Sequence, residues 1–157
     1  MGNAQLNREV ADYIDATTFA VLAYVREDKT PVLRAMGSFV ASGPDIYFST
    51  RNDAAKVREI SQHPRISFFF EHDNQELPAW RNVLLVGNAE RIETGGEFQR
   101  AVDLLSGRIP RFKEQIAQGE LPNTQIFKLK TEEIEYLDFG QGLGHVQKVV
   151  LDRKEPV

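Results

Sequence analysis

The pattern of apolar and polar positions predicts one helix followed by a series of short strands. In residues 4–16 the apolar side chains recur at helical spacing, which indicates an amphipathic helix. Further along, runs rich in β-branched and aromatic residues are separated by polar turns, as is typical of strands. These runs predict strands at residues 18–25, 32–41, 46–50, 65–71, 82–93 and 125–139. Residues 140–157 are expected to form a C-terminal arm that is either extended or contains one last short strand.

The order of these runs favours a mainly β (α+β) fold. Tight polar turns join most neighbouring runs, so the sheet is expected to be antiparallel, with residues 18–50 as a three-stranded meander. Six or seven antiparallel strands favour a closed or half-closed barrel, because closure removes exposed sheet edges. No change in composition divides the chain, so residues 1–157 are expected to form one domain. Flanking helices are expected at residues 53–63, 96–105 and 110–118.

Two irregularities interrupt the last long strands. Gly87 lies inside the run 82–93, where a glycine indicates a bulge or a close approach of two backbones. The alternation of residues 125–139 breaks at "TEE", residues 131–133. The regular pairing of strands is expected to be interrupted at these places.

Composition and charge narrow the range of functions. The chain of 157 residues has a net charge of −4, which disfavours binding to bulk nucleic acid or to an anionic membrane. It contains no cysteine, so disulfides and thiolate metal sites are excluded, and its three histidines are too scattered to suggest a zinc site. Charged residues within positions 1–20 argue against a signal peptide, and no apolar run approaches the roughly 20 residues of a membrane helix. We expect a cytoplasmic protein with no nucleic-acid or membrane partner.

The stretch "IYFSTRNDAAKVREI", residues 46–60, places cations where a helix start already carries partial positive charge. If Asp53 caps the helix, Lys56 lies in its first turn and Arg51 just precedes the cap. The helix dipole disfavours cations there by about 0.3–1 kcal/mol. A bound phosphate, with about −1.5 to −2 charges, would remove this conflict.

Ser49 and Thr50, at the end of the preceding strand, offer hydroxyl donors to the same anion. Each charge-assisted hydrogen bond contributes about 1.5–3 kcal/mol, so three or four would outweigh the dipole penalty. The alternative is that Asp53 neutralises the helix end while Arg51 and Lys56 point into solvent. This stretch alone leaves both interpretations open.

Two further residues are candidates for ligand binding. Arg34 lies at the centre of the run 32–41, on the same face as Met36. An arginine inside a strand is seldom buried alone, so Arg34 either shares an anion with another basic group or faces solvent on an edge strand. Gly37 fits a bulge or a place where a flat ligand approaches the backbone. Trp80, in a polar loop, could cover a planar ligand, fill a subunit interface or simply pack.

Taken in order, these features resemble the pyridoxamine 5′-phosphate oxidase-like family of FMN-binding split β-barrels, especially its general-stress-protein-like branch. The resemblance is carried by the Arg34-x-Met36 strand, by "IYFSTRNDAAKVREISQHPRISFFF", by "NVLLVGNAERI" and by "IFKLKTEEIEYLDF". It covers roughly residues 5–139, and the order and spacing of the motifs are more specific than any one of them.

The resemblance implies a homodimer with FMN at the interface. Arg34 would bind the FMN phosphate or ribityl chain, and the backbone around Ala35 and Met36 would lie along the isoalloxazine. Ser49, Thr50 and Lys56 would hold the phosphate, with Arg51 as an addition. Trp80 lies in the loop region that often reaches the flavin from the partner subunit. The expected set of cofactor-binding residues is Arg34, Ala35, Met36, Ser49, Thr50, Arg51, Lys56 and Trp80.

The C-terminal part departs from the true oxidase, in which arginines and a histidine hold the substrate. Here Ile134, Glu135 and His145 fit that pattern, but the arginines are absent. Oxidation of pyridoxamine 5′-phosphate is therefore not expected. The resemblance still implies an FMN-dependent oxidoreductase that acts on an unassigned small substrate, with NAD(P)H as a candidate electron donor and no catalytic residue assigned.

Other functions stay open on the sequence alone. The protein could be a non-catalytic FMN carrier or sensor, which the missing substrate motif favours. It could be a relative that binds a deazaflavin or heme instead of FMN. It could also be a small barrel that binds no cofactor and serves as an interaction module.

Overall fold

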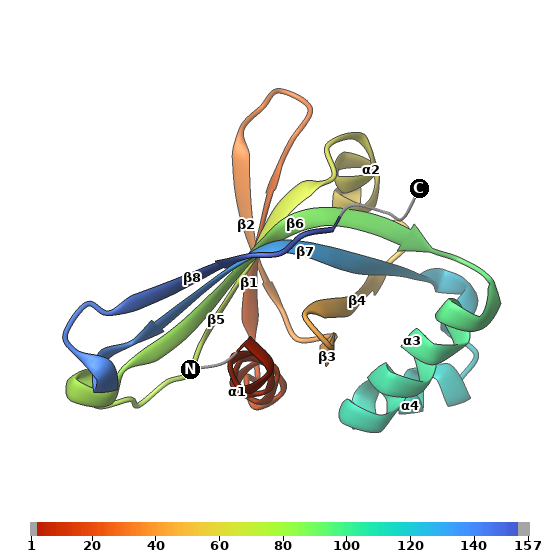
Figure 1. The fold of residues 1–157 in the computed structure, drawn as a ribbon. Coiled ribbons are helices and arrows are strands. Elements are labelled where there is room, and N and C mark those ends of the chain that lie inside the picture. Colours follow the sequence, from red (N-terminus) through yellow and green to blue (C-terminus); the bar gives the residue numbers. More distant parts are fainter. Residues whose placement is uncertain (1–2, 154–157) are drawn as a thin grey trace.

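The structure, a computed structural model, describes residues 3–153 and is built around one curled antiparallel sheet (Figure 1). Its strands are β1 (Ala20–Val25), β2 (Pro31–Met36), β3 (Phe39–Ser42), β4 (Asp45–Arg51), β5 (Arg65–Glu71), β6 (Arg81–Ile92), β7 (Thr124–Asp138) and β8 (Val146–Val150). The α-helices are α1 (Asn3–Asp15), α2 (Ala55–Gln62), α3 (Gly95–Arg108) and α4 (Pro110–Ala117). Short 3₁₀ turns are η1 (Leu77–Ala79), η2 (Leu121–Asn123) and η3 (Phe139–Gln141).

The strands follow the order β2-β1-β5-β6-β7-β4-β3, and β8 pairs with β7 beside this path. Every pairing is antiparallel, and the sheet curls into a half-barrel of seven strands with helices around it. The predicted split β-barrel with flanking helices is therefore confirmed. Within the C-terminal arm, β8 is the last short strand that the sequence left open. None of the helices in residues 3–153 combines the length and the apolar character needed to cross a membrane.

One predicted strand, residues 32–41, is two strands in the structure. The chain breaks at Gly37 and Ser38; β2 before the break pairs with β1, and β3 after it pairs with β4. The two consecutive strands thus lie at opposite ends of the sheet, and the predicted three-stranded meander is wrong. Apolar residues flank Gly37 and Ser38 on both sides, so the run reads as one strand in the local pattern. Only the choice of pairing partner, which is a long-range contact, separates the strands.

The predicted irregularities of the last long strands meet at one β-bulge. Val86 pairs with Glu133 and Gly87 with Thr131, so Glu132 is the extra residue on β7. A Cβ atom at Gly87 would overlap the backbone carbonyl of Lys130, which confirms the predicted close approach. Beyond the bulge, β7 changes its other neighbour from β4 to β8. The bulge therefore lies between the part of β7 that pairs with β4 and the part that pairs with β8.

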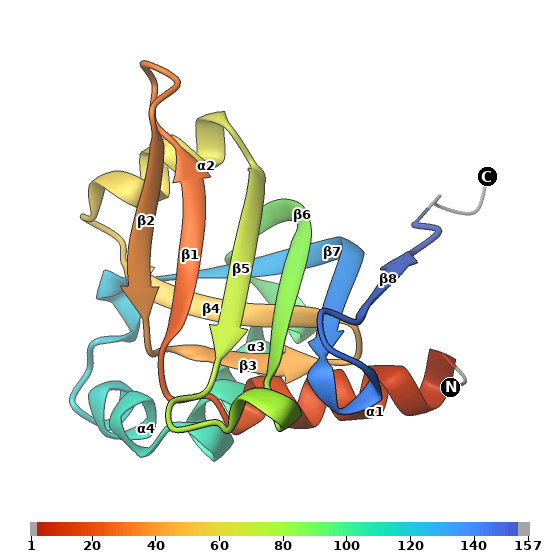
Figure 2. The ribbon, with the colours of Figure 1, turned by 90° about the vertical axis from the view of Figure 1, so that its left-hand side faces the viewer.

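Two hydrophobic clusters lie on opposite sides of the sheet. The larger one joins α1 and α2 to the inner face, where Phe48, Phe68 and Phe127 are fully buried. The smaller one lies between α3, α4 and the outer face of β3, β4 and β7. Figure 2 shows that, among the described residues, no helix covers the outer face of β2, β1, β5 and β6. That face stays open to solvent in the single chain.

The contact at the bulge predicts a specific loss of stability. Gly87→Ala would push a methyl group into the Lys130 carbonyl, and we expect the free energy of unfolding to fall by about 1–3 kcal/mol. Gly107→Ala in α3 is the matched control, because a Cβ there meets no atom within 4 Å. It should raise stability by about 0.4–1 kcal/mol. Urea unfolding followed by circular dichroism measures both, and an undiminished stability of Gly87→Ala would contradict the close contact.

Candidate functional site

A cleft of about 700 Å³ opens at the break between β2 and β3. Its floor is formed by the end of β2, the break itself and the end of β4, which contribute residues 35–38 and 49–51. Lys56 of α2 lines it, and so do residues of α4 and of the α4–β7 connection. Thr18 and Phe19, between α1 and β1, complete the lining. The volume falls within the range of about 300–1,000 Å³ that is typical of small-molecule sites.

Most of the residues predicted to bind a cofactor come together in this cleft. Those that line it are Ala35, Met36, Ser49, Thr50, Arg51 and Lys56. Arg34 is on β2, on the face it shares with Leu22, and acts electrostatically on Lys56. Trp80 is not part of the lining. Six of the eight predicted residues therefore lie in one cleft, and their role in cofactor binding stays a prediction.

The start of α2 differs from the prediction. Ala54, not Asp53, is the N-cap residue, and no side chain caps the helix. Lys56 is therefore the second helical residue, and the first turn contains no acidic side chain. Asp53 instead forms an exposed ion pair with Arg51, at 3.1 Å between Oδ1 and Nε. The predicted cap is wrong, and of the two cations only Arg51 is neutralised by this carboxylate.

Lys56 is half-buried without an acidic partner. Its Nζ lies 3.7 Å from the sulfur of Met36, and no carboxylate in residues 3–153 pairs with it. Burial lowers the pKa of Lys56, and the positive charge of Arg34 lowers it further. Arg34 itself donates only to the carbonyl of Leu33, at 3.0 Å. The positive charges of Arg34 and Lys56 thus act on each other, and a bound anion would relieve their repulsion.

Hydroxyl groups lie at the end of β4 in the same cleft. Ser49 is buried, and its Oγ shares a hydrogen bond with the Oγ of Ser38, in the break between β2 and β3. The Ser49 amide donates to the Ser38 carbonyl at 3.1 Å, which fixes the two serines relative to each other. Thr50 is half-buried and also lines the cleft. These groups can donate to an anion held at Lys56 once the serine pair reorients.

The sequence analysis missed the wall formed by α4 and the residues around it. Arg111 and Gln115 of α4 and Phe19 before β1 all line the cleft. The sequence did contain a signal for Arg111. The first turn of α4 has a cation at its second position and lacks an acidic residue. That is the pattern that identified Lys56. Phe19 carried no such signal, since nothing in the sequence distinguishes it from the core aromatics that follow.

Trp80 and the C-terminal candidates lie outside the cleft. The indole Nε1 of Trp80 donates to Glu71 at 2.9 Å, and its carbonyl accepts from the amide of Phe139. His145 is exposed and closes a turn by donating its amide to Gly142. Glu135 lies opposite Lys148 in the register of β7 and β8. The predicted contact of Trp80 with a flavin in a partner subunit stays a prediction.

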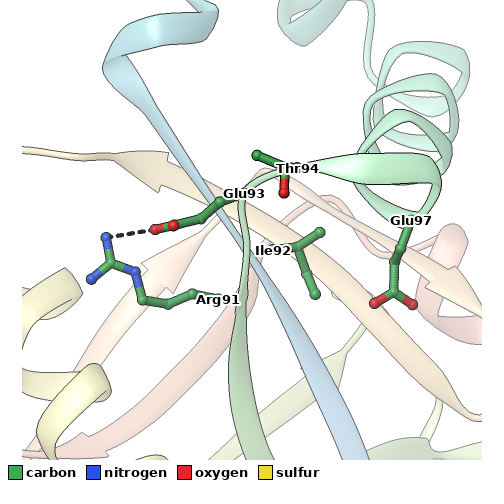
Figure 3. A pocket seen from close by; sticks show the side chains of 5 residues that line it. All are labelled: Arg91, Ile92, Glu93, Thr94 and Glu97. Carbon is green, nitrogen blue, oxygen red and sulfur yellow. Dashed lines mark ion pairs between the residues drawn. The ribbon is translucent and has the colours of Figure 1, made fainter.

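Another hollow of the surface, at the end of β6, contains charges that are already paired. Figure 3 shows Arg91 there, in an ion pair with Glu93 at 3.0 Å. Glu97, on the other side of this hollow, accepts from Lys128 at 3.0 Å and from Tyr47 at 3.1 Å. No group of His, Cys, Asp and Glu within residues 3–153 is arranged to hold a metal ion. The cleft at the strand break contains the half-buried Lys56, which has no carboxylate partner among the described residues, and is therefore the candidate site for an anionic ligand.

Three solved structures show how widely this fold recurs. A heme binding protein from Mycobacterium smegmatis matches with a TM-score of 0.75 and 19% identity over 90% of this chain and 56% of its own. A conserved hypothetical protein from Mycobacterium tuberculosis has a TM-score of 0.72 and 23% identity over 92% of this chain and 90% of its own. A protein from Clostridium acetobutylicum, related to general stress protein 26 of B. subtilis and described as of the pyridoxinephosphate oxidase family, has a TM-score of 0.70 and 14% identity over 96% and 97%.

These identities establish the fold alone, and the chain spans just over half the length of the Mycobacterium smegmatis protein. No curated protein matches the sequence. The sequence model of the pyridoxamine 5′-phosphate oxidase family, in contrast, matches residues 6–138, which include every strand except β8. The chain therefore belongs to the pyridoxamine 5′-phosphate oxidase family.

Proposed function

We propose that the cleft binds FMN with its phosphate between Lys56 and Arg34, and that the protein is an FMN-dependent oxidoreductase acting on a small substrate. The observation that carries this proposal is the half-buried Lys56 beside Arg34, with no carboxylate in the described residues to neutralise it. A buried cation without a counter-ion is costly, and an FMN phosphate supplies about −1.5 to −2 charges at this place.

The residues of the cleft fit the rest of the cofactor. The hydroxyls of Ser49 and Thr50 lie at the phosphate end. At Ala35 the small side chain leaves the backbone of β2 accessible to a flat ring. FMN when bound supplies hydride and single-electron transfer, and the protein supplies its orientation and electrostatic environment. Glu120 is the only carboxylate among the lining residues, and no group is assigned as a catalytic acid or base.

The cleft suits FMN better than heme. Heme iron is held by His, Cys, Tyr or Met side chains. Among the described residues that line the cleft, Met36 alone is of these types, and its sulfur contacts the ammonium of Lys56. One structural neighbour is a heme binding protein, so heme is the alternative that the experiment below must distinguish. A deazaflavin would use the same phosphate seat.

The first experiment compares cofactor retention in matched variants. Purified wild-type protein should show a flavin spectrum, and mass spectrometry of the released ligand should identify FMN. The double variant Arg34→Ala/Lys56→Glu should weaken FMN binding at least a hundredfold, because about two charge-assisted hydrogen bonds are lost at about 1.5–3 kcal/mol each. Lys29→Glu makes the same charge change as Lys56→Glu on the exposed β1–β2 turn, at the end of β2 away from Met36, and should bind FMN normally.

The same measurements decide between the alternatives. Normal FMN occupancy in the folded double variant would exclude the phosphate assignment. A Soret band in place of a flavin spectrum would assign heme, and a colourless protein that does not take up added FMN would indicate an interaction module. Oxidation of NAD(P)H with an added acceptor separates an oxidoreductase from a non-catalytic carrier.

The lowered pKa of Lys56 predicts a pH dependence of FMN affinity. In the free cleft the depressed pKa favours the neutral amine, whereas the bound phosphate favours the ammonium and raises the pKa again. Binding therefore takes up a proton at pH values between the two pKa values, and affinity must fall as the pH rises through this window. We expect the dissociation constant of FMN to increase on the alkaline side, measured by flavin fluorescence above pH 7, where the phosphate is largely dianionic.

Two controls isolate the lysine in this titration. Riboflavin, which lacks the phosphate, should show a flat profile relative to FMN. Arg34→Ala removes the neighbouring charge that lowers the pKa of Lys56, so the loss of affinity should begin at higher pH. A flat FMN profile in the wild-type protein would contradict the proposed contact between the ammonium and the phosphate.

We also propose that a second copy of the chain covers the open outer face of β2, β1, β5 and β6. Leu33 on this face is 64% exposed, and register places it opposite Ala23. Val21 and Phe69 extend the same face and are half-buried. Ala35 belongs both to this face and to the cleft, so a partner subunit there would border the flavin. In this arrangement Trp80 would be able to contact the flavin bound to the partner subunit.

Light scattering after size exclusion should report a dimer. Leu33→Asp and Phe69→Glu, made separately, should each raise the dissociation constant of the dimer at least tenfold, because a carboxylate would be buried without a partner at a cost of about 1–3 kcal/mol or more. Leu143→Asp, at a site that is 80% exposed and off this face, is the control and should leave the dimer intact. A wild-type monomer that retains flavin would refute the interface.

A further inference from the structure

The cleft holds a second cation without an acidic partner, on a different element from Lys56. Arg111 of α4 lines the cleft and is exposed, and no carboxylate in residues 3–153 pairs with it. The other exposed arginine of the lining, Arg51, is neutralised by Asp53. If the phosphate of FMN is held at Lys56, as proposed above, Arg111 remains available for the anionic group of another molecule.

An exposed aromatic ring lies on the same cleft. Phe19 is 67% exposed, which is unusual for a phenylalanine, and it borders the strand break. A Cβ atom on Gly37 would lie only 3.2 Å from Cε1 of Phe19, so the edge of the ring lies close to this glycine. The protein thus supports one edge of the ring, and most of the side chain stays open to solvent. A supported, exposed ring is suited to stack on a planar molecule.

Arg108 fixes these two features relative to each other. Its Nη2 donates to the carbonyl of Thr17 at 2.6 Å, two residues before Phe19, and its Nε donates to the carbonyl of Asp15 at 3.1 Å. Its Nη1 donates to the carbonyl of Phe39 at 2.6 Å, just after the strand break. Arg108 is the last residue of α3, directly before the segment that begins α4 and carries Arg111. One side chain therefore ties the segment of Phe19 to the segment of Arg111.

We propose that Phe19 and Arg111, assisted by Gln115, form a substrate subsite for a planar aromatic carboxylate. The guanidinium offers a planar fork that matches a carboxylate in a bidentate manner. Gln115 lies four residues after Arg111, on the same face of α4, and adds an amide donor. Glu120 also lines the cleft, and its negative charge disfavours a phosphate dianion more strongly than a carboxylate monoanion. This subsite rests on the oxidoreductase function proposed above and would define the class of its substrate.

The test uses three probes that share one ring system. These are 2-naphthoate, 2-naphthyl phosphate and neutral 2-naphthol, titrated by calorimetry into wild-type protein with and without saturating FMN. We expect 2-naphthoate to bind at least tenfold more tightly than 2-naphthol, with the phosphate between them. Arg111→Gln should abolish this preference for the anion, and Phe19→Leu should weaken all three probes. Lys113→Gln, a neighbour on α4 that does not line the cleft, should leave all affinities unchanged.

Each contrary result has a definite meaning. Equal affinity for 2-naphthoate and 2-naphthol would overturn the subsite, as would the absence of binding by any probe. If Arg111→Gln lowers the affinity for FMN but not for 2-naphthoate, Arg111 belongs to the cofactor phosphate and the proposal is overturned. If the Phe19→Leu variant no longer forms a dimer, the ring belongs to the subunit interface and not to the subsite. Because the titration is also done without FMN, binding of 2-naphthoate alone would support the subsite even if the protein failed to bind FMN.

Discussion

The break at Gly37 and Ser38 is the constraint from which the rest of the structure follows. Two consecutive strands separate there and pair at opposite ends of one sheet, so the sheet must curl for the short connection to reach both. The Ser49 amide and hydroxyl bridge to Ser38 and hold the end of β4 against the break. The cleft lies where the two ends of the half-barrel meet, and its existence depends on this separation.

Charge in this cleft is only partly neutralised. Several cations elsewhere have carboxylate partners, as Arg91 has with Glu93 and Lys128 with Glu97. Lys56 in the cleft has no such partner among the described residues, and the positive charge of Arg34 acts on it where burial reduces screening by water. Arg111 on α4 repeats the situation on another wall. Unpaired cations in one concave site favour the binding of an anion, because the anion relieves the repulsion between them.

The uncovered outer face and the cleft share the edge strand β2. Helices α3 and α4 cover the outer face over β3, β4 and β7, and none of the described helices covers it over β2, β1, β5 and β6 (Figure 2). Ala35 has its backbone in both regions. The proposed second copy would therefore couple assembly to cofactor binding, because a subunit docked on this face would border the cleft at Ala35.

The sequence alone determined the helix α1, most strand positions, the bulge at Gly87 and the local clash of cations at Lys56, because periodicity, glycine and charge are local properties. Its family resemblance also led to the correct fold. Only the tertiary structure decided that residues 32–41 form two strands, since β2 and β3 differ in their partners and not in their composition. The same holds for Phe19: its place at the cleft depends on Arg108, which lies 91 residues from its contact at Thr17, and such a contact leaves no local trace.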